Sequence, residues 1–73
     1  MTKEELITKV SSEGYAVDLT LQDDCLFCAA TEESYFLENF EVIMEYDFIE
    51  NNQNKKLRTV ASTEYDLTGF YII

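Results

Sequence analysis

The segment from Phe40 to Phe48 constrains the fold more than any other part of this sequence. Large apolar side chains stand at every second position, and acidic residues stand between several of them. Because side chains alternate between the two faces of a strand, this pattern predicts a long β-strand with one buried face. The alternating apolar residues are Phe40, Val42, Met44, Tyr46 and Phe48, and the acidic residues among them are Glu41, Glu45 and Asp47.

The N-terminal region carries the signals of one helix, from about residue 2 to residue 13. Thr2 and Glu5 have the spacing of a capping box, in which each side chain accepts a hydrogen bond from the other residue's backbone N–H. Gly14 stands where a helix often ends in a left-handed residue. An apolar stripe at helical spacing is formed by Leu6, Ile7 and Val10.

Five strands are predicted after this helix, joined by short polar connections. A polar loop is expected at residues 50–55, and residues 31–39 fit either a loop or one helical turn. Short connections favour antiparallel neighbours, because a parallel crossover needs a dozen or more residues. The predicted fold is therefore one α+β domain over residues 1–73, with the helix packed on an antiparallel β-meander. The expected strands cover residues 15–21, 25–30, 40–49, 57–63 and 67–73.

The long strand has apolar residues on both of its predicted faces, and a single helix can cover only one face of a sheet. Exposed apolar patches usually mark interfaces, so the uncovered face is predicted to bind a protein partner or a second copy of the chain as a homodimer. A curled sheet that buries both apolar sets is the alternative. The candidate partner surface consists of Glu41, Ile43, Glu45, Asp47 and Ile49.

The charge balance of the chain is strongly acidic. Fifteen acidic and five basic residues give a net charge of −10, and only Lys3 and Lys9 are basic before Asn51. Without a basic patch to neutralise phosphates, direct binding to nucleic acid or to an anionic membrane is not expected. The field can instead steer a basic protein partner. The first residues lack a signal-peptide pattern and no apolar run is long enough to span a membrane, which predicts a cytoplasmic protein.

No residue pattern points to catalysis, a cofactor or a metal site. Cys25 and Cys28 form a C-x-x-C, but their α-carbons would lie about 10 Å apart on a strand, and a disulfide needs less than about 7 Å. We therefore expect reduced, structural thiols with at least one in the core. The chain has no His, which excludes His-dependent catalysis and leaves zinc without enough ligands. The sequence predicts that the protein is not an enzyme.

Three classes of function remain from these observations, and a small enzyme or ligand carrier comes last because the sequence shows no site for it. The sequence favours a non-enzymatic protein-binding or regulatory module. The alternative is an acidic nucleic-acid mimic that blocks a basic DNA- or RNA-binding site of a partner protein, because ordered carboxylates can imitate a line of phosphates. In that alternative the carboxylates on the long strand act together, with Asp18, Asp23 and Asp24 expected nearby. An ordinary polar face, whose charges keep the sheet from pairing with other chains, accounts for the same carboxylates.

Short segments over nearly the whole chain carry a resemblance to one protein family. They are Lys3-Glu4-Glu5-Leu6, Gly14-Tyr15, Asp24-Cys25-Leu26-Phe27-Cys28, Phe40-Glu41-Val42 with Tyr46 and Phe48, Ala61-Ser62 and Leu67-Thr68-Gly69. In these segments the chain resembles a small family of bacterial proteins that are often labelled phosphoribosylpyrophosphate synthetase. The chain departs from the family pattern at Asp47, where relatives tend to have Arg, and it lacks their short Ala-Tyr-Gly tail.

The resemblance implies a shared fold and no known activity. The enzyme label would require a phosphate-cradling loop on a much larger α/β scaffold, and this sequence contains neither.

Overall fold

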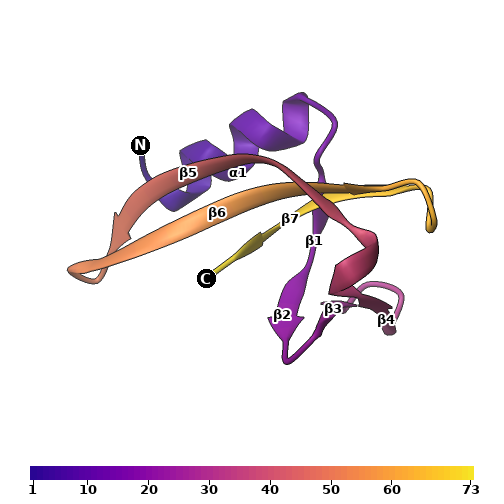
Figure 1. The fold of residues 1–73 in the computed structure, drawn as a ribbon. Helices are drawn as coiled ribbons and strands as arrows, with labels where there is room; N and C mark the ends of the chain where they lie inside the picture. The colour runs from indigo at the N-terminus through magenta and orange to yellow at the C-terminus, as the bar shows by residue number, and fades with distance from the viewer.

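A computed structural model describes residues 1–73, which form one helix and seven strands in two sheets (Figure 1). This confirms the α+β class, but the single five-stranded meander is wrong because the strands divide between two sheets. The elements in chain order are α1 Lys3–Ser12, β1 Val17–Asp18, β2 Thr20–Gln22, β3 Cys25–Cys28, β4 Glu33–Phe36, the 3-10 turn η1 Leu37–Asn39, β5 Glu41–Glu50, β6 Gln53–Ser62 and β7 Leu67–Ile72.

The first sheet has four strands in the order β1-β7-β6-β5, and the second has three in the order β2-β3-β4. All neighbours are antiparallel except β1 and β7, which pair in parallel. The expectation of only antiparallel pairs is therefore wrong. Its argument applied to strands joined by a short connection, whereas β1 and β7 come from opposite parts of the chain and no direct connection limits their direction.

The strand predicted at residues 15–21 is divided at Leu19 between the two sheets. β1 precedes Leu19 and joins the first sheet, and β2 follows it and joins the second. Leu19 is buried, with 2% of its surface exposed, and its N–H donates to the carbonyl oxygen of Phe70 at 2.9 Å. Residues 31–39, which the sequence left undecided, contain β4 followed by η1. A strand pattern in the sequence does not reveal a change of sheet, because the alternation of side chains continues through it.

The predicted signals at both ends of α1 are present in the structure. Thr2 N–H donates to Glu5 Oε1 at 2.8 Å, and Glu5 N–H donates to Thr2 Oγ1 at 3.2 Å, which completes the capping box. At the other end Gly14 has a φ of 102°, and the N–H groups of Gly14 and Tyr15 donate to carbonyl oxygens of the last turn. This ten-residue helix, the only α-helix in the fold, lacks the length and apolar character needed to cross a membrane.

The β5–β6 hairpin is closed by a two-residue turn at Asn51 and Asn52. Both residues have positive φ values, 52° and 63°, and Glu50 pairs with Gln53. Two consecutive left-handed residues are the mark of the turn whose twist matches that of a β-hairpin, and Asn tolerates this conformation well. The polar loop expected at residues 50–55 is therefore too long, because β6 begins at Gln53.

A β-bulge at Ile43 changes which face of the sheet each side chain of β5 occupies. Val42 lies opposite Val60, and Met44 lies opposite Thr59, so that Ile43 is an extra residue without a partner of its own. Met44 N–H donates to the Thr59 hydroxyl at 3.0 Å beside the bulge. An extra residue shifts the two-residue alternation by one. The prediction that Phe40 to Phe48 present their alternating apolar side chains on one face is therefore wrong.

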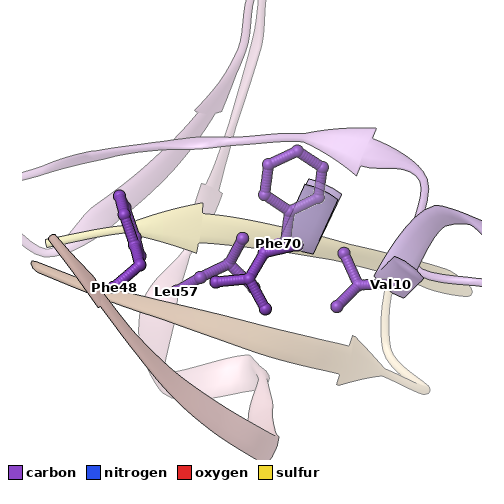
Figure 2. Packing of buried hydrophobic residues seen from close by; sticks show 5 residues of the cluster. Val10, Phe48, Leu57 and Phe70 are labelled. Atoms are coloured by element: carbon purple, nitrogen blue, oxygen red, sulfur yellow. The ribbon is translucent and has the colours of Figure 1, made fainter. Parts of the chain in front are cut away.

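The hydrophobic core consists of two clusters, one on each face of the first sheet. In the first cluster, α1 contributes Leu6 and Val10, which pack with Phe48, Leu57 and Phe70 of the sheet (Figure 2). In the second cluster, residues of the second sheet and the preceding segment cover the opposite face; its members are Leu19, Leu26, Cys28, Val60 and Tyr71. A separate layer, rather than a curled sheet, covers this second face around Val60 and Tyr71.

Gly69 makes the parallel pairing of β1 and β7 sterically feasible. It lies opposite Val17, and a Cβ added at Gly69 would stand 2.5 Å from the Val17 carbonyl oxygen and 3.0 Å from Leu19 Cδ1. The first of these atoms belongs to the backbone and cannot rotate away. Any side chain at position 69 therefore separates β1 from β7.

We expect Gly69→Ala to lower the free energy of unfolding by about 1–3 kcal/mol, the typical cost of overpacking a core position. Urea unfolding followed by circular dichroism measures this loss as a lower midpoint. Ser34→Thr adds one carbon at an exposed position of β4 and serves as the control; it should change stability by less than about 0.5 kcal/mol. Equal midpoints for the two variants would contradict the close approach at Gly69.

Candidate functional site

β5 is the last strand of the first sheet, and one of its backbone edges has no neighbouring strand. Figure 1 shows it as the outer strand of the long β5–β6 hairpin. The strand contains ten residues, and its side chains include the whole predicted partner surface.

The turn at Asn51 and Asn52 determines which backbone groups face the open edge. A two-residue turn makes Glu50 and Gln53 a hydrogen-bonded pair, and bonded and non-bonded pairs alternate along an antiparallel hairpin. The register then turns the N–H and C=O groups of Ile49, Asp47 and Glu45 outward. These groups can form hydrogen bonds with an added strand without breaking any hydrogen bond between β5 and β6.

Exposed large apolar side chains concentrate on β5. Four of the seven such residues in the structure belong to this strand, although apolar side chains of this size are normally covered. Two of them, Val42 and Met44, flank the bulge. The four residues and their exposed fractions are Val42 51%, Ile43 43%, Met44 51% and Ile49 70%.

The structure brings together only part of the predicted partner surface. Glu45, Asp47 and Ile49 lie on the face away from α1, opposite Arg58, Lys56 and Asn54 of β6. Glu41 lies opposite Ala61, on the face that α1 covers, because the bulge at Ile43 separates it from the other two acidic residues. The sequence has no local signal for this bulge, since Ile is an ordinary strand residue. All five predicted residues are nevertheless exposed.

The acidic residues expected near this strand lie elsewhere in the fold. Asp18 ends β1, which is separated from β5 by two strands of the first sheet. Asp23 and Asp24 form the turn between β2 and β3 in the second sheet. The three residues therefore do not extend the line of carboxylates on β5.

The carboxylates of Glu45 and Asp47 form ion pairs across the hairpin. Glu45 lies 2.7 Å from Arg58 Nε and 3.4 Å from Lys56 Nζ, and Asp47 lies 2.8 Å from Lys56 Nζ. Arg58, and to a lesser degree Lys56, lowers the pKa of Glu45. Asp47 and then Glu45 raise the pKa of Lys56. All these side chains are partly exposed, so the pairs contribute little to stability, but they neutralise the charge beside the strand.

A cavity of about 500 Å³ lies where the two sheets meet, and a cysteine thiol is among the groups that line it. Cys28 lines it and is only 5% exposed. The Thr31 hydroxyl and the backbone N–H of Thr31 lower the pKa of the Cys28 thiol, although burial acts in the opposite direction. The lining contains one carboxylate, Asp18, and no basic side chain; its apolar members include Val17, Tyr35 and Leu67.

Both cysteines are free thiols, and Cys28 belongs to the core, which confirms the prediction of at least one core thiol. No group of three or more His, Cys, Asp or Glu side chains is placed to hold a metal ion.

No family model, no curated protein and no solved structure matches this chain. The resemblance to the small bacterial family therefore stays a prediction from the sequence. The candidate site rests on the geometry of β5 alone.

We expect an NMR titration to give Glu45 a pKa below its ordinary value of 4.5. A carboxyl group whose pKa is lower in the folded than in the unfolded chain stabilises the fold when it is ionised. The Glu45 ion pairs therefore stabilise the fold above about pH 4.5. This stabilisation disappears as the pH falls through the folded-state pKa. Arg58→Gln should raise the pKa of Glu45 more than Lys56→Gln does. A pKa of Glu45 that is the same in the parent and in Arg58→Gln would show that the ion pair is absent in solution.

Proposed function

We propose that this chain is a non-enzymatic protein-binding module that takes up a partner along the open edge of β5. The observation that carries the proposal is a ten-residue edge strand with four exposed large apolar side chains. Strand addition to such an edge obtains affinity from backbone hydrogen bonds and specificity from the side chains beside them.

The open edge has two of the features that keep edge strands from pairing with other chains, and it lacks others. Acidic side chains and the bulge at Ile43 act against pairing. β5 is nevertheless ten residues long and contains neither Pro nor Lys. The regular stretch after the bulge remains a template for a further strand. A partner that occupies this edge accounts for a feature that would otherwise favour aggregation.

The charges around β5 favour an apolar contact over nucleic-acid mimicry. Residues 41–62 contain four acidic and three basic residues, so the hairpin has a charge of only −1. Carboxylates that imitate phosphates have to be free to meet the cations of a partner. Glu45 and Asp47 are already paired with Arg58 and Lys56, which weighs against the mimic at this strand.

We expect Ile49→Lys to abolish capture of a partner by the immobilised protein from a lysate of its native host. The substitution places a charge on the open edge at a side chain that is 70% exposed, so the fold should be unaffected. Thr8→Lys adds the same charge at an exposed position of α1 and is the matched control. The proposal is supported by a partner that the parent and Thr8→Lys retain and Ile49→Lys loses.

The ionic strength distinguishes the apolar contact from the mimic. An apolar contact should persist when NaCl is raised from about 0.1 to 0.5 M, whereas binding by exposed carboxylates should weaken steeply. Retention of the same partner by Ile49→Lys, or release of the partner by salt, would contradict the proposal. Analytical ultracentrifugation tests the homodimer: a parent that dimerises while Ile49→Lys stays monomeric would identify the partner as a second copy.

A further inference from the structure

The negative charge of the molecule is concentrated in residues 17–39, which comprise β1, the second sheet and the 3-10 turn η1. No Lys or Arg occurs between Lys9 and Lys55, and the 23 residues from 17 to 39 hold six acidic residues. None of these six forms an ion pair, in contrast to Glu45, Asp47 and Glu50 of β5. The six are Asp18, Asp23, Asp24, Glu32, Glu33 and Glu38.

The second sheet has one face in the core and one face without a covering layer. Leu26 is fully buried and Tyr35, its cross-strand partner, packs against the same core cluster. The residues next to Leu26 on β3 and next to Tyr35 on β4 point to the other side of the sheet. This outer face of the second sheet is formed by Cys25 opposite Phe36 and by Phe27 opposite Ser34.

Phe36 is the most exposed aromatic side chain on this outer face, with 60% of its surface accessible. It lines a shallow recess with Asp24, Leu37 and Glu38. An aromatic ring is therefore presented to solvent next to two carboxylates that have no basic partner.

Backbone contacts hold this recess in place. Leu37 N–H donates to the Asp24 carbonyl oxygen at 2.9 Å, and Phe36 N–H donates to the Tyr65 hydroxyl at 3.2 Å. The Tyr65 hydroxyl also accepts a hydrogen bond from Asn39 Nδ2 at 3.1 Å. The β6–β7 loop, which adds Glu64 and Asp66, is thus fastened beside the recess. A surface held in this way is available to a partner without first becoming ordered.

We propose that the outer face of the second sheet, centred on Phe36, docks an arginine-containing basic segment of a partner protein. A guanidinium group can stack on the Phe36 ring and donate hydrogen bonds to the carboxylates of Asp24 and Glu38. Arg suits this combination better than Lys, because its planar group both stacks and donates in pairs. Charge complementarity identifies the occupant: nucleic acid and anionic lipid are repelled, and a second copy has few basic residues to offer. This contact does not depend on the proposed contact at β5.

The test is an NMR titration of the ¹⁵N-labelled protein with a capped peptide of arginines separated by glycines. We expect the largest shift changes at Asp24 and at residues 36–38. Phe36→Ala should weaken binding about 2–5-fold, the equivalent of a cation–π contact of about 0.5–1 kcal/mol at an exposed site. Ile73→Ala removes an exposed apolar side chain that belongs to neither proposed surface and should leave the affinity unchanged. The lysine version of the peptide should bind more weakly than the arginine version.

A second pair of variants separates a defined site from general attraction to an acidic protein. Glu38→Gln removes a carboxylate at the recess, and Glu4→Gln removes an unpaired carboxylate on α1. We expect Glu38→Gln to weaken binding more than Glu4→Gln does. Equal effects of the two, unchanged affinity in Phe36→Ala, shift changes spread over all acidic residues, or no binding by the parent would each overturn the proposal.

Discussion

The one-residue bulge at Ile43 decides which core cluster each apolar side chain of residues 40–48 can reach. Before the bulge, Phe40 packs against the cluster that involves the second sheet; after it, Tyr46 and Phe48 pack against the cluster that involves α1. A regular strand would direct all these side chains to one face and leave the other layer without contacts from this segment. The bulge thus allows one continuous segment to contribute to both sides of the first sheet.

The fold separates two kinds of surface that are mixed together along the sequence. The β5–β6 hairpin is nearly neutral, because its acidic and basic residues almost balance, and β5 carries four exposed large apolar side chains among its carboxylates. The second sheet carries carboxylates without basic partners around an exposed aromatic ring. A net charge of −10 describes neither surface well. The two proposed contacts follow this division: an added strand at the edge of β5 and a basic segment on the acidic face.

Local signals were sufficient where neighbouring residues determine the structure. The capping box of Thr2 and Glu5 and the end of the helix at Gly14 could be predicted because each involves contacts within a few residues. The candidate site could be predicted only in part. The pattern left open whether the apolar members of this surface are exposed or buried in a curled sheet, and it did not show the separation of Glu41 from Glu45, because a bulge depends on the partner strand. The exposure of Phe36 was not predicted, since nothing in its local sequence distinguishes a covered strand face from an open one.

The sequence by itself determined the α+β class, the position of the helix, the acidic character and the presence of strands in all five predicted regions. Alternation and capping encode these properties at short range. Only the tertiary structure decided that the chain forms two sheets, that β1 runs parallel to β7, and that β5 lies at an open edge. These features depend on contacts between segments that are distant in the sequence, such as the close approach of Gly69 to Val17. The residue pattern of either segment alone does not show which distant segment it will contact.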